Sequence, residues 1–249
     1  MIGAIMLVDL DDTLFQTRGK CPPGIADEQL TPLGFARDGS PLSYATPRQM
    51  AFLRWLADST HLVPVTARSL DALRRVRIPY AAAICAHGGL ILDDAGAVDR
   101  TWHSHIASKA AAEAGRLEAM AAAISQSAAR AGEPVTARVL AEDQVPLYVI
   151  AKHSGADVAA LNAVVDAAVP EVPAGWTEHR NGNNVAFLPQ HLGKAQAVRH
   201  ILPGLRARFP DSPVIGIGDS RTDAAFMGLC DFAMLPTDSQ LAERLLRDF

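Results

Sequence analysis

The sequence predicts an α/β fold with a Rossmann-like, doubly wound parallel sheet as its core, interrupted by an inserted α+β domain. Three continuous apolar runs, at residues 4–8, 62–65 and 214–217, are typical of strands buried on both faces of a parallel sheet. Apolar residues at helical spacing, at residues 47–57 and 194–205, precede the second and the third run. Strands that alternate with helices in this way indicate an α/β fold.

A polar residue with potential chemistry follows each of the three predicted strands. These residues are Asp9, Thr66 and Asp219. Ligands of α/β proteins bind beyond the carboxyl ends of the parallel strands. We therefore expect the three side chains to meet at one edge of the sheet.

The middle of the chain has a different pattern, which predicts a small antiparallel sheet with helices on one face. The expected elements are an alanine-rich helix, two strands, a second helix and a hairpin, at residues 107–131, 135–141, 147–151, 157–169, 176–180 and 184–188. The hairpin turn would be Asn181-Gly182-Asn183. We expect residues 100–185 to form the inserted domain, and residues 1–99 with 186–249 to form the core.

The stretch at residues 15–45 shows no clear period and contains several proline and glycine residues. A structureless stretch of this length is uncommon in a compact domain. We expect it to form a flap over the site or to contain a short hairpin.

The composition argues against several function classes. With a net charge of −4, the chain has no electrostatic reason to bind nucleic acid or an anionic membrane surface. Cys21, Cys85 and Cys230 are far apart and odd in number, which favours reduced thiols over disulfides or a zinc site. The apolar run at residues 2–8 is too short for a membrane span. We expect a soluble, cytoplasmic protein.

Asp9 and Asp11, directly after the first strand, are candidates for metal binding and catalysis. In an extended chain they lie on the same side, and two close carboxylates need a cation to remain ionised. Mg²⁺ takes oxygen ligands and usually keeps waters and a substrate phosphate. Asp9 could bind the metal with one oxygen and attack phosphorus with the other, while Asp11 acts as general acid and base. The alternative is a metal-free turn or a helix cap.

Two further acidic residues and a lysine could complete this site. Asp219 follows Gly216-Ile217-Gly218, and Asp223 lies about one helical turn later. Asp219 could complete the metal shell or be an ordinary N-cap, and Asp223 could hold a metal-bound water or orient a lysine. Lys194 could neutralise a phosphoryl group and the Asp9 carboxylate, or it could be a surface lysine.

The end of the second strand is a candidate phosphate-binding site. The hydroxyl of Thr66 and the backbone N–H groups there, at Ala67 and Arg68, could bind phosphate oxygens. A cap for the next helix is an equally good interpretation of Thr66.

The combination, in chain order, resembles the four motifs of the haloacid dehalogenase superfamily: Asp9-x-Asp11-x-Thr13, Thr66, Lys194 and Gly218-Asp219-x-x-x-Asp223. The resemblance covers residues 1–95 and 186–249, and the insert between the Thr and Lys motifs resembles the family's type-two cap. The segments around Thr66 and Lys194 are similar to the Cof-type and sucrose-phosphatase-like branch.

The resemblance implies a magnesium-dependent phosphatase that acts through an aspartyl-phosphate. Asp9 would be the nucleophile and Asp11 the general acid and base. Mg²⁺ would be held by Asp9, the Asp11 carbonyl and Asp219, and the phosphoryl group by Thr66 and Lys194. Asp223 is a further candidate at the metal. The substrate would be a small phosphorylated metabolite such as a sugar phosphate, and the cap would select its non-phosphate part.

Three departures from the branch bear on specificity. Asp12 stands where the branch usually has glycine, His87-Gly88 replaces its usual Asn-Gly, and the stretch at residues 15–45 is longer. His87 could face the substrate or be a satisfied loop residue.

A polar cluster near the return from the cap could bind sugar hydroxyls or be only a polar hairpin turn. Its members are Arg180, Asn181, Asn183 and Asn184, and Asn184 is our candidate for substrate binding.

Other functions remain compatible with parts of this pattern. A phosphotransferase or phosphomutase of the same fold would use the same residues but exclude water from the aspartyl-phosphate. A non-catalytic sugar-phosphate binder would have no need for both Asp9 and Asp11, and a signalling receiver domain would carry its phosphorylated Asp on a middle strand. The sequence leaves open the substrate, the choice between hydrolysis and transfer, and the oligomeric state.

Overall fold

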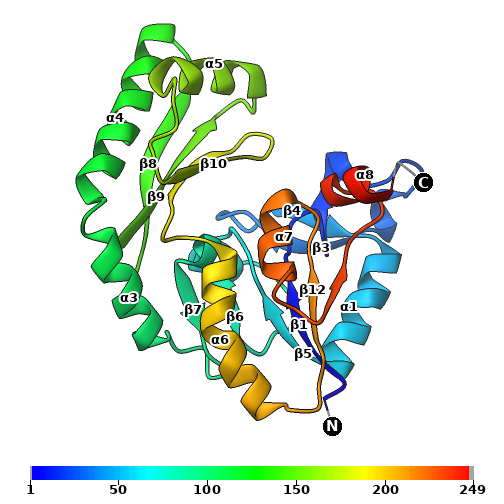
Figure 1. The fold of residues 1–249 in the computed structure, drawn as a ribbon. Coiled ribbons are helices and arrows are strands. Elements are labelled where there is room, and N and C mark those ends of the chain that lie inside the picture. Colours follow the sequence, from blue (N-terminus) through cyan, green and yellow to red (C-terminus); the bar gives the residue numbers. More distant parts are fainter. Residues whose placement is uncertain (1, 247–249) are drawn as a thin grey trace. The chain divides into compact units, whose positions relative to one another are not determined.

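The computed structural model describes residues 2–246, which divide into two compact units (Figure 1). We call residues 2–102 with 194–246 the core unit and residues 103–193 the inserted unit. The insert was expected at residues 100–185, so its carboxyl end lies later than expected. The reason is strand β11 (Val185–Pro189), which pairs with the strands of the insert and not with the core sheet.

The core sheet contains four parallel strands in the order β13-β12-β1-β5. They are β1 (Ala4–Val8), β5 (Thr60–Pro64), β12 (Val214–Ile217) and β13 (Phe232–Met234). All five residues of β1 are buried, and this strand pairs with β5 on one side and with β12 on the other. The three strands predicted from apolar runs are therefore confirmed, and the most uniformly apolar of them is central.

Helices cover both faces of the core sheet. Helix α1 (Pro47–Ser59) lies between β1 and β5 in the chain, and α7 (Arg221–Met227) lies between β12 and β13. These two connections run in opposite directions along the sheet, so right-handed crossovers place α1 and α7 on opposite faces, as Figure 1 shows. The doubly wound, Rossmann-like core is thus confirmed.

The remaining elements of the core unit are short, apart from one helix. The helix predicted before the third strand is α6 (Lys194–Arg208). The shorter elements are the helices α2 (Leu70–Leu73) and α8 (Gln240–Leu246) and the hairpin of β6 (Ala83–Cys85) and β7 (Leu90–Leu92). A parallel bridge between Val65 and Ile84 joins this hairpin to the end of β5.

The stretch that showed no period forms a three-stranded antiparallel sheet in the order β2-β4-β3, which we call the small sheet. Its strands are β2 (Gln16–Thr17), β3 (Thr31–Phe35) and β4 (Pro41–Ala45), and the 3-10 helices η1 (Arg18–Lys20) and η2 (Asp27–Gln29) lie between β2 and β3. The register between β3 and β4 shifts twice. These irregularities hide the alternation by which a strand is recognised in sequence.

The inserted unit is an antiparallel sheet with helices on one face, as expected. The sheet order is β10-β11-β9-β8, where the three other strands are β8 (Val135–Glu142), β9 (Val145–His153) and β10 (Trp176–Arg180). Helices α4 (Ala114–Ala131) and α5 (Val158–Ala168) pack on it through a shared apolar core. The predicted hairpin is confirmed as β10 and β11.

One prediction for this unit is wrong, because the long alanine-rich helix is two helices. Helix α3 (Arg100–Ala110) ends before α4 begins, and residues 111–113 form a turn. Glu113 lies at the break, where its carboxylate accepts a hydrogen bond from the Trp176 indole N–H at 3.2 Å. Gly115, the second residue of α4, is a local signal for the break, because glycine weakens a continuous helix. The tertiary contact of Glu113 lies at the same place. Within the described residues, no helix has both the length and the apolar character needed to cross a bilayer.

Candidate active site

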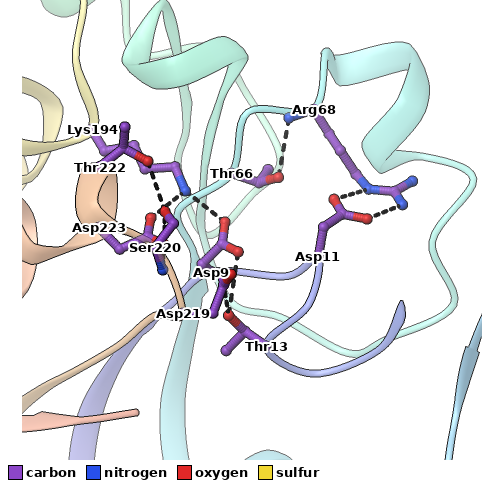
Figure 2. A network of polar contacts seen from close by, with 10 residues as sticks. All are labelled: Asp9, Asp11, Thr13, Thr66, Arg68, Lys194, Asp219, Ser220, Thr222 and Asp223. Atoms are coloured by element: carbon purple, nitrogen blue, oxygen red, sulfur yellow. Dashed lines mark hydrogen bonds and ion pairs between the residues drawn. The ribbon is translucent and has the colours of Figure 1, made fainter. Parts of the chain in front are cut away.

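The ends of three neighbouring strands bring polar side chains to the carboxyl edge of the core sheet (Figure 2). Asp9 directly follows β1, while Asp219 and Thr66 come shortly after β12 and β5. Since β12, β1 and β5 are adjacent in the sheet, their carboxyl ends are adjacent too. The structure therefore places the three residues at one edge, as the order of elements predicts.

Lys194 joins two carboxylates in the interior of this site. Its Nζ lies 2.6 Å from Oδ1 of Asp9 and 2.6 Å from Oδ1 of Asp223. The exposed fractions are 7% for Lys194, 6% for Asp9 and 0% for Asp223. An ammonium group is buried to this extent only when carboxylates compensate its charge. The alternative of a surface lysine is therefore excluded.

Asp223 is oriented by Ser220, a residue that the sequence analysis did not single out. Its second oxygen accepts hydrogen bonds from the backbone N–H of Ser220 at 3.1 Å and from the Ser220 hydroxyl at 2.6 Å. Ser220 is the N-cap of α7, so the N-cap interpretation of Asp219 is wrong. The pattern Ser-x-x-Asp before a helix is the signal that could have identified this pair.

Two glycines allow α7 to approach the sheet closely enough to place Asp223. A Cβ at Gly218 would lie 2.4 Å from Cβ of Asp223, and one at Gly216 would lie 2.9 Å from Cα of Met227. No real Cβ tolerates such a distance, so any side chain would displace the helix. These glycines are needed for close packing of the helix on the sheet.

Thr13 links Asp9 to Asp219. Its hydroxyl lies 3.3 Å from Oδ2 of Asp9 and 3.2 Å from Oδ1 of Asp219, and it is buried. We call Asp9, Asp219 and Asp223 the carboxylate cluster, because one oxygen of each lies within 4.8 Å of the others.

Burial makes the charged forms of Asp9 and Asp219 unfavourable. It raises the pKa of Asp9 well above its usual range; Lys194 opposes this shift and Asp223 adds to it. Burial and then the charge of Asp223 raise the pKa of Asp219 to about 6. Burial alone would lower the pKa of Lys194, but Asp9 and Asp223 outweigh it and hold that pKa above its usual range. The ammonium group thus stays charged, while the carboxylates need more positive charge than it provides.

The donor set fits a hard divalent cation. The cluster contains three carboxyl groups but only one ammonium group, that of Lys194, so it has too little positive charge to compensate three carboxylates. Every donor in the cluster is a carboxylate oxygen, with no histidine nitrogen or cysteine sulfur. Mg²⁺ prefers such oxygen ligands, whereas zinc is usually bound by nitrogen and sulfur. The residues present therefore fit Mg²⁺.

Thr66 is fully buried and is not the cap of the next helix. Its hydroxyl oxygen accepts a hydrogen bond from the Arg68 backbone N–H at 3.1 Å. Helix α2 is instead capped by Ser69, whose hydroxyl accepts from the N–H of Ala72 at 3.2 Å. The cap interpretation of Thr66 is therefore wrong, while phosphate binding by Thr66 and Ala67 stays a prediction.

Asp11 faces the guanidinium group of Arg68 (Figure 2). Nε of Arg68 lies 2.7 Å from Oδ2 of Asp11, and Nη2 lies 2.6 Å from Oδ1. We expected Asp9 and Asp11 to share a cation as a pair, but the carboxylates that gather with Asp9 are Asp219 and Asp223. The predicted acid–base role of Asp11 and the metal contact of its carbonyl remain predictions.

Two residues that depart from the pattern of the Cof-type and sucrose-phosphatase-like branch have a left-handed backbone conformation. Asp12 has φ of 61° and His87 has φ of 55°. Glycine or asparagine adopts this conformation at little cost, and aspartate tolerates it better than most residues. This explains why glycine is usual where Asp12 stands. His87 is buried, and its backbone N–H donates to the carbonyl of Thr66 at 3.1 Å.

Asn184 lies in the inserted unit, in the turn between β10 and β11. Its amide donates to the carbonyl of Asn181 at 3.4 Å. Asn183 pairs with the backbone of His153, with Oδ1 accepting at 3.1 Å and Nδ2 donating at 2.6 Å, and Arg180 is bound by Asp166. These contacts explain a polar turn, and sugar binding by Asn184 stays a prediction.

No protein-family model and no curated protein matches the sequence. Solved structures match its fold. The sucrose-phosphatase from Synechocystis, solved with sucrose and phosphate, covers 100% of this chain and 88% of its own, at 16% identity and a TM-score of 0.53. The C-terminal domain of the trehalose-6-phosphate phosphatase from C. albicans covers 90% and 72%, at 13% identity and a TM-score of 0.54.

A third similar structure is a trehalose-6-phosphate phosphatase related protein, which covers 93% of this chain and 86% of its own, at 17% identity and a TM-score of 0.50. At such identities the likeness concerns the fold. The resemblance predicted from four motifs is confirmed at that level. The chain has the fold of the haloacid dehalogenase superfamily phosphatases, in the form seen in sucrose-phosphatase and trehalose-6-phosphate phosphatase.

Proposed function

We propose that this protein is a Mg²⁺-dependent phosphomonoester hydrolase that forms an aspartyl-phosphate on Asp9. The observation that carries the proposal is the environment of the Asp9 carboxylate. One oxygen is paired with the buried ammonium of Lys194, and the other faces Thr13 beside Asp219. Such an arrangement orients a carboxylate nucleophile and supplies positive charge next to the position of the incoming phosphoryl group.

In the first half-reaction, an oxygen of Asp9 forms a bond to phosphorus while the bond from phosphorus to the substrate's alcohol oxygen breaks. Asp11 donates a proton to that oxygen, so the alcohol leaves neutral. Lys194 stabilises the charge on the phosphoryl oxygens. Thr66 accepts from the N–H of Arg68, which leaves its hydroxyl proton to be donated to a phosphoryl oxygen.

In the second half-reaction, water forms a bond to phosphorus while the bond to the Asp9 oxygen breaks. Asp11, now ionised, accepts a proton from that water. Phosphate leaves, the carboxylate of Asp9 is regenerated, and Asp11 again holds a proton. The double role of Asp11 returns the enzyme to its initial state after each turnover.

The carboxylate cluster would hold Mg²⁺, with the backbone carbonyl of Asp11 as a further ligand. When bound, the cation supplies the positive charge that Asp9, Asp219 and Asp223 lack, and it stabilises negative charge on the phosphoryl oxygens. The fit of the oxygen donors and the shortage of positive charge in the cluster support this assignment.

For the substrate we propose a small sugar phosphate, selected by the inserted unit acting as a cap. The names of the similar structures, sucrose-phosphatase and trehalose-6-phosphate phosphatase, support this class. The amide of Asn184 is suited to hydrogen-bonding sugar hydroxyls. We also propose a cytoplasmic location. In the described part of the chain Cys21, Cys85 and Cys230 form no disulfide, which supports this proposal.

The test is phosphate release from a panel of sugar phosphates with Mg²⁺ and with a chelator. We expect Mg²⁺-dependent release from some members, none with Asp9→Asn, and unchanged release with Asp58→Asn, an exposed carboxylate on α1. A hydroxylamine-sensitive phosphoprotein in rapidly quenched samples would identify the aspartyl-phosphate. Full turnover by Asp9→Asn would overturn the nucleophile assignment.

Phosphotransfer is the second candidate function, since the same residues would form the same aspartyl-phosphate. Adding a sugar acceptor distinguishes the two. A hydrolase releases phosphate at the rate at which substrate is consumed. A transferase releases less phosphate than the substrate it consumes and forms a new phosphorylated sugar.

A further inference from the structure

We infer that Arg68 is a positioning residue that orients the carboxylate of Asp11, and that the small sheet holds Arg68 for this task. The inference rests on the proposed function, because it gives Arg68 a part in proton transfer at Asp11. It concerns the side chain of Arg68, whereas the sequence predicts phosphate binding by the backbone N–H of this residue, which here donates to Thr66.

The first support is the geometry of the pair. Nε and Nη2 of Arg68 contact separate oxygens of Asp11, at 2.7 and 2.6 Å. Two parallel hydrogen bonds fix the plane of a carboxylate, which a single bond from a lysine cannot do. The Arg68 side chain is 13% exposed and that of Asp11 is 38% exposed, so the arginine is the anchored partner of the two.

The second support is the contact of Arg68 with the small sheet. Nη2 also lies 3.4 Å from Oγ of Ser43, a residue of β4 that is 1% exposed. The guanidinium carbon lies 5.2 Å from the centre of the Phe15 ring, close enough for a cation–π contact. A Cβ added at Gly34 would lie 3.0 Å from Cβ of Ser43 and 3.5 Å from Nη2. The sheet thus encloses the guanidinium group and limits its orientations.

The pair leaves Asp11 able to transfer a proton. A carboxylate has about four lone-pair positions, and the two hydrogen bonds from Arg68 use one on each oxygen. A second position on each oxygen remains for a leaving alcohol or an attacking water. Arg68 can therefore orient the Asp11 carboxylate while one lone-pair position on each oxygen stays available for the proton.

Positioning and phosphate binding predict different kinetics. A positioning residue acts on the proton given to the leaving group, which an alkyl phosphate needs and p-nitrophenyl phosphate does not, because p-nitrophenolate is weakly basic. A phosphate-binding residue acts on the phosphoryl group, which both substrates share. The value of kcat/KM reports the steps up to formation of the aspartyl-phosphate and so isolates the acid role.

The experiment measures kcat/KM of the wild type and of Arg68→Ala and Arg68→Lys toward p-nitrophenyl phosphate and toward the best sugar phosphate of the panel. We expect both variants to lose about 10-fold to 100-fold toward the sugar phosphate, within the range of general acid catalysis, and less than about threefold toward p-nitrophenyl phosphate. Added guanidinium should partly restore Arg68→Ala. Arg37→Ala, an exposed arginine of the turn between β3 and β4, is the matched control.

A second measurement uses Asp11→Asn as the background. If Arg68 acts through Asp11, Arg68→Ala should cause almost no further loss toward the sugar phosphate in that background. Equal losses toward both substrates, or a full further loss in the Asp11→Asn background, would overturn the inference and return Arg68 to phosphate binding. A wild type that releases phosphate from neither substrate would instead refute the proposed function, and the inference with it.

Discussion

The two halves of the candidate site are built in different ways. Around Asp9, side chains from three separated segments converge, and Asp9, Lys194 and Asp223 are buried. Around Asp11, a partly exposed carboxylate depends on one arginine, which an irregular small sheet encloses. The first half is held by the packing of the core, and the second by a single bidentate ion pair.

This difference separates two demands of the proposed chemistry. A nucleophile and its metal ligands need fixed positions and compensated charge. A group that first donates and then accepts a proton needs access to water and a fixed orientation. The structure meets the first demand by burial and the second by an anchored arginine at the rim. Substitutions in the Asp9 half and in the Asp11 half test this difference.

The largest effect is expected for Asp9→Asn. Loss of the nucleophilic carboxylate should reduce kcat by about 10³-fold or more, because a residue that forms the covalent intermediate has no substitute in the site. Steady-state phosphate release and trapping of the phosphoprotein measure this. The assignment of Asp9 as the nucleophile would be refuted if Asp11→Asn abolished the trapped phosphoprotein with p-nitrophenyl phosphate and Asp9→Asn did not.

Gly218→Ala tests whether packing holds the Asp9 half. The new Cβ would lie 2.4 Å from Cβ of Asp223, so we expect a loss of about 1–3 kcal/mol in the free energy of unfolding and a marked loss of activity. Gly204→Ala is the matched control, since nothing lies within 4 Å of a Cβ there. In helix α6 it should stabilise by about 0.5–1 kcal/mol. Urea denaturation measures both, and equal stability of the two variants would contradict the prediction.

Asp219→Asn tests the charge balance of the carboxylate cluster. Burial and Asp223 raise the pKa of Asp219 to about 6. A carboxyl whose pKa is raised on folding contributes stability at low pH, and that stability is lost as pH rises through the raised pKa. In metal-free wild type, Tm should therefore fall as the pH rises from about 4 to about 7, and this fall should be smaller in the variant.

Mg²⁺ sharpens the same test. At a concentration of about 100 times its Kd, a ligand stabilises the folded state by about 2.7 kcal/mol. Wild type at pH 7.5 should show a rise in Tm with Mg²⁺, and Asp219→Asn should lose most of it. An unchanged Mg²⁺ response in the variant would remove Asp219 from the metal site.

The smallest effect is expected in the Asp11 half, for Ser43→Ala. Removing one long hydrogen bond to Arg68 should lower kcat/KM toward a sugar phosphate by about two- to fivefold, which corresponds to about 1 kcal/mol or less. Activity toward p-nitrophenyl phosphate should stay near that of wild type. Ser40→Ala is the control, because the Ser40 hydroxyl donates to Asp38 in the turn between β3 and β4. Equal activity of the two variants toward the sugar phosphate would show that the small sheet does not act on Asp11.

Much of the fold could be predicted because its signals are local. The apolar run of β1 and the helical spacing of α1 and α6 are visible in short windows of sequence. A short hairpin was one expectation for residues 15–45, and β3 with β4 form it. Its strands could not be located from the sequence, because register shifts and prolines break the alternation. The division between α3 and α4 was missed although Gly115 lies at the start of α4, because alanine on both sides gives the segment a strong helical character.

Some residues of the candidate site could be predicted from the sequence, and others could not. The order of motifs identified Asp9, Lys194, Asp219 and Asp223 as partners, because strand ends of a parallel sheet must converge. Ser220 was overlooked although it lies only three residues before its partner Asp223. Arg68 was assigned to phosphate because its partner Asp11 is distant in the sequence. The contact between Arg68 and Asp11 joins residues 57 positions apart, and the contact of Arg68 with Ser43 depends on the small sheet.

The sequence by itself determined the α/β core, the inserted unit and the residues that gather around Asp9. These follow from periodicity and from the geometry of parallel strands, which act over a few residues. Only the tertiary structure decided which partner each charge has: Lys194 between Asp9 and Asp223, and Arg68 on Asp11. The physical reason is that an ion pair depends on distance in space and on burial, and the chain sets both only when it packs.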